Sequence, residues 1–236
     1  MITTRSFAVL GALLALGLAL FGIQIGKAVH DGREFDRYFT VRGLSTREVK
    51  ATQVIWPIRY SVSAEDLPTL RQEIDRSKTL VFAFLAEHQI STTDCWIGIP
   101  ATEDRAAQYR DPNQPRLPRY NATITLVVRS SQVDRVKQAI QKSDTLLDQG
   151  LALLVDDYAY RTQFEFDALN EIKPAMIEEA TANARAAAEK FAQDSHATVG
   201  RIRKATQGVV EITDRDIATP ELKVVRVVTT VEFFIE

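Results

Sequence analysis

The chain has 236 residues, of which 45% are hydrophobic, 25% charged and 8% aromatic. This composition is typical of a globular protein and excludes a disordered chain, a collagen-like repeat and a disulfide scaffold. Lysine and arginine number 29 and aspartate and glutamate 31, so the net charge is -2 and no basic surplus indicates nucleic acid as a partner. The single cysteine, Cys95, excludes an internal disulfide and a multi-cysteine metal site.

The most distinctive segment is an apolar run over residues 7–26, which contains one polar residue, Gln24, and no charged residue. A helix of this length rises about 30 Å, the thickness of the hydrocarbon core of a bilayer. We therefore expect residues 1–35 to form a membrane anchor and a short linker, with a single transmembrane helix over residues 7–26. The alternative is a cleaved signal peptide, whose apolar region is normally only about 7–15 residues long.

The charges beside this run leave its orientation open. Arg5 precedes the run, whereas Lys27, Arg33, Arg37 and Arg42 follow it. Counted by the positive-inside rule, these residues place the large C-terminal region in the cytoplasm. The difference is small, so charge alone does not decide the side of the membrane.

Residues 36–236 are predicted to form the folded region, which begins with a strand and a helix. Alternation at period two predicts one long strand over residues 47–62, in which Pro57 indicates an edge or a bulge. A helix follows, with Ser63 as its N-terminal cap and apolar residues spaced three and four apart as far as Phe84.

Two strands and a second helix come next. The strands are predicted over residues 93–103 and 119–129. Three prolines and several arginines between them are typical of an irregular hairpin tip. The second helix begins at Ser130 or Ser131 and ends at Gly150, because glycine adopts the left-handed conformation after a helix without strain.

The C-terminal part combines three strands with a third helix. Aromatic and charged positions alternate over residues 151–168, which predicts a strand. Pro174 fits the first turn of a helix whose stripe of mostly small residues ends at Phe191. Strands over residues 197–213 and 222–235 complete the chain.

This order of elements predicts an α+β fold with mainly antiparallel sheets and packed helices. The series strand, helix, strand, strand occurs twice, over residues 47–129 and 151–236. We therefore expect two similar halves joined by the second helix and preceded by the N-terminal transmembrane helix.

No motif in the chain indicates a chemical reaction. The sequence lacks GxGxxG, GxxxxGKS/T, GxSxG and HExxH. Asp156 and Asp157 are neighbours in a predicted strand, so their carboxylates point to opposite faces. Cys95 is typical of a small buried hydrophobe, and the aromatic residues of the 151–168 strand are typical of a core; these are Tyr158, Tyr160, Phe164 and Phe166. We expect no catalytic residue, no metal site and no cofactor.

The connection over residues 104–118 is a candidate interface. It carries Arg105, Arg110 and Arg116 among three prolines. Proline restricts an unfolded loop, so less entropy is lost when the loop is held in one shape. Arginine is favoured in interfaces because its planar fork bonds carboxylates in pairs. We expect neighbouring subunits to contact this loop; the alternative is a solvated loop with no partner.

Four segments of the chain resemble the SIMPL-domain family, a group of bacterial extracytoplasmic proteins whose biochemical function is largely undefined. They are FTVRGLSTREVKATQVIWPI (39–58), RYNATITLVVR (119–129), DTLLDQGLALLVDDYAYR (144–161) and ATANARAAAEKFAQDSHATVGRIRKATQ (180–207). The last segment is an alanine-rich helix followed by Gly200 and a strand. His196 departs from the family pattern, in which glycine often follows that helix. None of these segments is catalytic in the family, so no active-site residue is implied.

The resemblance implies an exported protein that retains a signal peptide or anchor, and it favours the periplasm over the charge count. Some family members form ring-like oligomers, and some are associated with tolerance of envelope stress. The leading hypothesis is therefore a non-enzymatic, single-pass protein of the bacterial inner membrane. Its C-terminal domain would lie in the periplasm and act as a self-assembling scaffold, a homo-oligomer linked to envelope stress tolerance.

Two other classes of function stay open. The chain is alternatively an extracytoplasmic binding or sensing module for an unknown small ligand or a partner protein, which it would bind through residues 158–166 or 104–118. An enzyme is the least supported class, because no nucleophile–base pair or metal-binding set can be assembled from the sequence.

Overall fold

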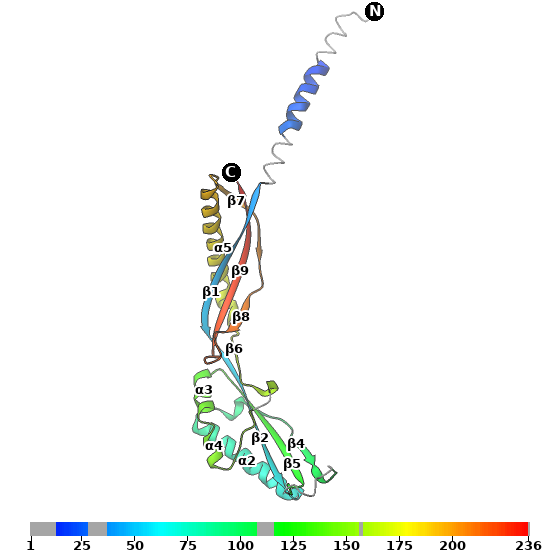
Figure 1. Cartoon of the computed structure of the whole chain (residues 1–236), viewed down its shortest axis with the longest axis vertical. Coiled ribbons are helices and arrows are strands. Elements are labelled where there is room, and N and C mark those ends of the chain that lie inside the picture. Colours follow the sequence, from blue (N-terminus) through cyan, green and yellow to red (C-terminus); the bar gives the residue numbers. More distant parts are fainter. Residues whose placement is uncertain (1–12, 28–36, 108–115, 156–157, 236) are drawn as a thin grey trace, which may run out of the picture. The chain divides into compact units, whose positions relative to one another are not determined.

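The structure is a computed structural model that describes residues 13–27, 37–107, 116–155 and 158–235. The strands and helices form two compact units (Figure 1). The central unit consists of Arg47–Ile172 and Ile212–Val225, and the terminal unit consists of Met1–Thr46, Lys173–Glu211 and Arg226–Glu236. Both units combine helices with antiparallel strand pairing, which confirms the predicted α+β class.

The central unit is built around a five-stranded sheet in the order β3-β5-β2-β6, with β4 paired to β5. Its strands are β2 (Gln53–Ala64), β3 (Cys95–Ile97), β4 (Ala101–Asp104), β5 (Tyr120–Ser130) and β6 (Gln163–Glu165). β2 and β5 run antiparallel, with Val54 opposite Ser130 and Ala64 opposite Tyr120. Alternate residues of both strands are buried, as the alternation in the sequence predicts.

Helices α2 (Leu67–Glu87) and α3 (Val133–Gln141) cover the buried face of this sheet (Figure 1). The core between them contains Ile58 of β2 and Leu126 of β5. α2 begins later than predicted, because Asp66 and not Ser63 caps it. The Asp66 carboxylate accepts a hydrogen bond from the Thr69 amide at 2.9 Å, which satisfies a free N–H of the first turn.

Two predicted elements of the central unit are each divided in the structure. The strand over residues 93–103 becomes β3 and β4, because Gly98 and Pro100 interrupt it. The second helix becomes α3 and α4 (Thr145–Asp148), separated by residues 142–144. Gly150 follows α4 with φ of 81°, so the prediction of a left-handed glycine after this helix is confirmed.

The long strand predicted over residues 47–62 is wrong, because the chain changes sheets within it. β1 (Tyr38–Lys50) ends just before β2 begins. The Ala51 amide donates to the Glu221 carbonyl at 2.7 Å, and the next amide, of Thr52, donates to the Glu165 carbonyl at 2.8 Å. Glu221 lies beside β9 (Leu222–Ile235) and Glu165 ends β6, so consecutive residues pair with strands of different sheets.

Most of the second sheet belongs to the terminal unit. Its order is β1-β9-β7, and β8 (Glu211–Asp214) also pairs with β9. β7 (Val199–Gln207) and β8 replace the single strand predicted over residues 197–213, whereas β9 matches the predicted strand 222–235. The order strand, helix, strand, strand does recur, but β6 joins the first sheet and β1 the second. The two sheets therefore do not coincide with two continuous halves of the chain.

Helix α5 (Leu169–Asp194) packs on the second sheet along a narrow stripe of one residue in every four. The buried residues are Met176, Ala180, Ala184, Ala188 and Ala192. Side chains also join α5 to β1: the Ser45 hydroxyl donates to Glu179 at 2.9 Å, and the Asn183 amide donates to the Leu44 carbonyl at 2.8 Å. Two details of the predicted third helix are wrong. α5 starts five residues before Pro174, which the sequence predicts in its first turn, and Phe191, predicted at the end of the packed stripe, is 63% exposed.

An N-terminal helix is described over residues 13–27. The other part of the predicted transmembrane helix, residues 7–12, lies outside the described residues. Within the part of the chain that the structure describes, no helix has the length and hydropathy that a membrane crossing requires. The transmembrane helix over residues 7–26 therefore stays a prediction.

Candidate functional site

An apolar cleft of about 410 Å³ opens on the central unit, where β2 loses its neighbour strand. Ile55 pairs with Gln163 of β6, and Tyr60 forms an isolated bridge with Leu153. Between these two pairings β2 has four residues, 56–59. The segment that leads from Leu153 to β6, here called the returning segment, has nine, 154–162. Nine residues cannot pair one to one with four, so the pairing is interrupted after the Leu154 amide, which donates to the Arg59 carbonyl at 2.7 Å, and the cleft lies at this interruption.

The cleft combines apolar walls with three charged side chains. Its apolar lining comes from β2, from the end of α3 with the chain that follows it, and from the returning segment: Trp56, Pro57, Ile140, Leu147, Leu153, Leu154, Val155 and Tyr160. Arg59, Arg161 and Asp144 supply the charges. The Arg59 guanidinium lies 4.3 Å from the centre of the Tyr160 ring, a cation–π contact that holds one wall in place.

The strand predicted over residues 151–168 is therefore mostly absent from the described residues. Only Gln163–Glu165 are in a strand, and Tyr158–Tyr160 form a single 3-10 turn. Tyr158 is 77% exposed and Tyr160 is also exposed, so the prediction that they belong to the core is wrong, while Phe164 is buried as predicted. Phe166 is half-buried. Asp156 and Asp157 lie outside the described residues.

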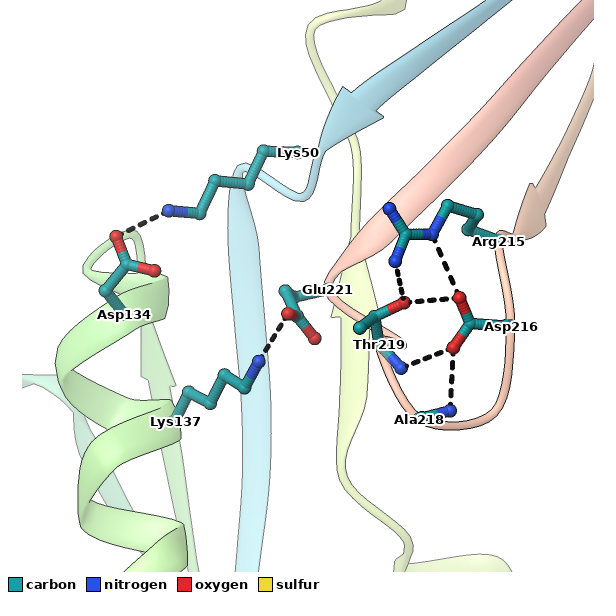
Figure 2. Close-up of polar contacts among 8 residues, drawn as sticks. All are labelled: Lys50, Asp134, Lys137, Arg215, Asp216, Ala218, Thr219 and Glu221. Atoms are coloured by element: carbon teal, nitrogen blue, oxygen red, sulfur yellow. Dashed lines mark hydrogen bonds and ion pairs between the residues drawn. The ribbon is translucent and has the colours of Figure 1, made fainter.

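The turn that joins β8 to β9 is held by a dense set of hydrogen bonds (Figure 2). The Asp216 carboxylate accepts from the amides of Ala218 and Thr219 at 2.9 and 2.8 Å, from the Thr219 hydroxyl at 2.6 Å, and from Arg215 Nε at 2.9 Å. Arg215 also donates to the Thr219 hydroxyl at 2.9 Å. The Thr219 hydroxyl and then Arg215 hold the pKa of Asp216 well below its usual range. Ile217, at the tip of this turn, is fully exposed at 101%.

Two ion pairs join α3 to the strand ends beside it (Figure 2). Lys137 pairs with Glu221, which is 7% exposed, and Lys50 Nζ lies 2.5 Å from Asp134 Oδ2. Burial is the largest single influence on the pKa of Glu221 and acts to raise it, but the hydrogen bonds from Lys137 and from its own backbone, together with the charges of Lys137 and Arg215, lower that pKa. The Lys50 pair is much more exposed. The Lys137–Glu221 pair is thus the more buried of the two.

The structure describes two of the three candidate interface arginines. Arg105 donates to Glu103 at 3.3 Å within the same chain, and Arg116 is exposed. Arg110 lies outside the described residues. The arginine with paired bonds to a carboxylate is Arg119, whose Nε and Nη2 lie 3.1 and 2.9 Å from the two oxygens of Asp104. This fork lowers the pKa of Asp104 and closes the hairpin of β4 and β5 from within.

A model of the SIMPL family, described as a protein of unknown function (DUF541), matches residues 39–231. The chain belongs to the SIMPL family. No curated protein matches the chain. The SIMPL match covers residues of both compact units, from the second residue of β1 to the second half of β9, and so confirms the family resemblance that the sequence segments indicate.

The departure of this SIMPL chain from the family pattern at His196 has a visible consequence. His196 follows α5 with φ of 53°, in the left-handed region that glycine occupies without strain. Gln89, after α2, has φ of 58°. Both helices therefore end with a side chain where a glycine would fit more easily.

Cys95 is half-buried at the start of β3, and burial followed by the charge of Asp94 raises the pKa of its thiol. Among the described residues, no group of three or more histidine, cysteine, aspartate or glutamate side chains could hold a metal ion. Sequence reasoning missed the cleft and Ile217. The one signal for the latter is an isoleucine inside the polar turn Asp214–Glu221.

Proposed function

We propose that this SIMPL chain is a non-enzymatic scaffold that assembles with copies of itself while tethered to the bacterial inner membrane. In this proposal the helix over residues 7–26 spans the membrane once, the folded region lies in the periplasm, and the assembly contributes to tolerance of envelope stress. The matched family is described only as a protein of unknown function, so the extracytoplasmic placement and the link to envelope stress rest on the resemblance given in the sequence analysis.

The observation that carries self-assembly is the apolar surface around the cleft of the central unit. Leu147, Leu154, Val155 and Tyr160 all line the cleft and are all exposed. Contiguous apolar surface of this kind marks protein–protein contact sites, because exposing it to water is unfavourable. A second copy of the chain is the partner that is always present at equal concentration.

The cleft also favours a second candidate function, an extracytoplasmic binding module. Its volume falls in the range of about 300–1,000 Å³ that small-molecule sites occupy. Aromatic and aliphatic walls with two arginines fit an apolar ligand that carries a negative charge. In that case the protein would work as a monomer or dimer.

The mass of the full-length protein in detergent distinguishes these two functions. We expect a native mass spectrum to show a symmetric oligomer of several copies without added ligand. A monomer or dimer would reject the scaffold and favour the binding module.

Two measurements test the membrane part of the proposal. Full-length protein should stay in the membrane fraction through carbonate washes, because a transmembrane helix inserts almost irreversibly. Mature protein that begins near Ala28 would instead indicate a cleaved signal peptide.

In a Cys95→Ser background, Ile99→Cys should react with an impermeant thiol reagent once the outer membrane alone is permeabilised. Reaction only after lysis of the inner membrane would reject the periplasmic placement.

A further inference from the structure

We propose that the terminal unit binds an anionic phospholipid surface through a basic patch at one end of the second sheet. The basic patch consists of Tyr38 and Arg42 of β1, Arg201, Arg203 and Lys204 of β7, and Phe234 of β9. All of these residues belong to the terminal unit. The inference rests on the proposed membrane tether, and it names a second contact of the folded region with the membrane.

The basic patch lies on the face of the second sheet that α5 leaves open. Val41 of β1 and Phe233 of β9 belong to the core that α5 covers. Successive side chains of a strand point to opposite faces, so Arg42 and Phe234, which directly follow these two, point away from α5. Arg42 is exposed and Phe234 is half-buried. This face is therefore accessible to a partner.

The same end of the sheet receives the chain from the membrane segment. The start of β1 lies beside the end of β9, because the Ile235 amide donates to the Arg37 carbonyl at 3.0 Å, and Val199 of β7 lies opposite Ile235 (Figure 1). Residues 27–37 connect the proposed transmembrane helix to Tyr38. Fully extended, they span at most about 40 Å. The tether thus keeps the basic patch at a high effective concentration beside the bilayer.

Positive charge is in excess on the basic patch. Glu232 of β9 pairs with Arg203 at 3.0 Å and lies opposite Lys204, so one carboxylate faces two cations. Arg42 and Lys204 are both exposed, and no side chain in the described part of the chain forms an ion pair with either. Guanidinium and ammonium groups bind phosphate oxygens through charge-assisted hydrogen bonds. An anionic headgroup supplies the negative charge that these two side chains lack.

Aromatic rings lie directly beside these charges. The guanidinium carbon of Arg203 lies 4.0 Å from the centre of the Tyr38 ring, and that of Arg201 lies 5.5 Å from the centre of the Phe234 ring. The first contact crosses β9, which lies between β1 and β7. Tyrosine is enriched where headgroups meet the apolar layer of a bilayer, because its ring is apolar and its hydroxyl is polar. The combination fits a surface on which phosphate adjoins apolar chains.

The position of β7 disfavours a second copy of the chain as the partner. β7 lies at the edge of the second sheet, where a further strand could add. Every residue from Arg201 to Gln207 is exposed. The basic side chains on this edge oppose strand addition, because an added strand would crowd them. A lipid surface makes no such demand on the backbone of β7.

Fluorescence quenching by lipid tests the contact. Thr40→Cys, in a Cys95→Ser background, places a fluorophore between Tyr38 and Arg42 on the same face of β1. The full-length protein is inserted into vesicles with spin-labelled headgroups, made of phosphatidylcholine alone or mixed with phosphatidylglycerol. We expect stronger quenching with phosphatidylglycerol, and loss of the difference in high salt because ions screen the attraction. Equal quenching in the two kinds of vesicle would overturn the proposal.

Removal of charge tests which residues make the contact. Arg42→Gln combined with Lys204→Gln should lower the equilibrium constant for contact with phosphatidylglycerol vesicles about 25-fold, or about fivefold for each charge. Arg226→Gln is the control, because Arg226 is exposed on the same face of β9 but lies eight residues, about 26 Å, from Phe234. That distance exceeds the screening length of about 10 Å, so we expect unchanged quenching. Equal losses in the two variants would reject the basic patch as the contact.

The tether and the basic patch fail in different measurements. Protein that resists carbonate but is quenched equally in both kinds of vesicle keeps the tether and loses the patch. Release of the protein by carbonate would reject the transmembrane helix. Flotation of the same protein with each kind of vesicle before the wash then decides the patch. Flotation with phosphatidylglycerol vesicles alone would uphold it, and flotation with both or with neither would overturn it.

Discussion

Two residues of this protein depart from the backbone conformation that their type prefers. His196 and Gln89 hold left-handed backbone angles after α5 and α2. For residues other than glycine this conformation is unfavourable by about 1–2 kcal/mol, because Cβ approaches a carbonyl oxygen.

His196→Gly should raise the free energy of unfolding by about 0.5–1 kcal/mol, since relief of this strain exceeds the added entropy of the unfolded chain. Urea unfolding followed by far-ultraviolet circular dichroism measures the change. Gly150→Ala is the opposite control, because it places a Cβ on a backbone with φ of 81°, and it should destabilise by about 1 kcal/mol. Equal effects of the two substitutions would contradict the explanation.

The Lys137–Glu221 pair makes the stability of the central unit depend on pH. The pKa of Glu221 is lower in the folded protein than its ordinary value of 4.5. A depressed folded-state pKa stabilises fully above the ordinary value, and the contribution is lost as the pH falls through the folded-state pKa.

Lys137→Met should therefore destabilise by about 1–3 kcal/mol at pH 7, because it leaves a buried carboxylate without its cation. The difference from wild type should shrink as the pH falls below 4.5. Lys50→Met removes a cation from a more exposed pair, and we expect a change of less than about 1 kcal/mol. The free energy of unfolding, measured at several pH values, checks both expectations.

At the scale of elements, the close contact between α5 and β1 explains the alanine stripe. A Cβ built on Gly43 would lie 1.7 Å from the Ala180 carbonyl oxygen and 2.6 Å from the Ala184 amide. Only a glycine on β1 and alanines on α5 let the helix backbone approach the strand this closely. Larger stripe residues would hold the helix away from Val41, Val231 and Phe233 of the core.

Gly43→Ala should accordingly destabilise the protein by about 3 kcal/mol or more, because the obstructing atoms belong to a helix backbone that cannot move locally. Thermal unfolding measures the effect. Gly98→Ala is the matched control: there a Cβ would lie 3.3 Å from the end of the exposed Trp96 ring, which can shift. Similar losses of stability in the two variants would show that the contact with α5 is not the cause.

At the scale of the whole molecule, the arginine-rich connection over residues 104–118 remains a predicted interface. Residues 106–117 can be replaced by a short Gly-Ser turn without removing Asp104 and Arg119, which close the hairpin. The variant should keep its circular dichroism spectrum but show a lower oligomeric mass, because Arg110 and Arg116 are lost. Retention of the full mass would exclude this loop from the interface.

Local patterns in the sequence determined the elements whose burial depends on near neighbours. The alternation of β5, the apolar spacing of α2 and the glycine after α4 each reflect interactions within one element or one turn. The fold class and the SIMPL family followed from the order of such elements. The N-terminal apolar run predicts an anchor in the same way, from length and hydropathy alone.

Only the tertiary structure decided which strands pair and where pairing fails. The sequence predicts one strand across Ala51 and Thr52 because the alternation at period two continues through them, whereas their amides donate to carbonyls beside strands of different sheets. The cleft exists because nine residues return along four of β2. Such a mismatch in length depends on segments about a hundred positions apart, and no local periodicity carries that information.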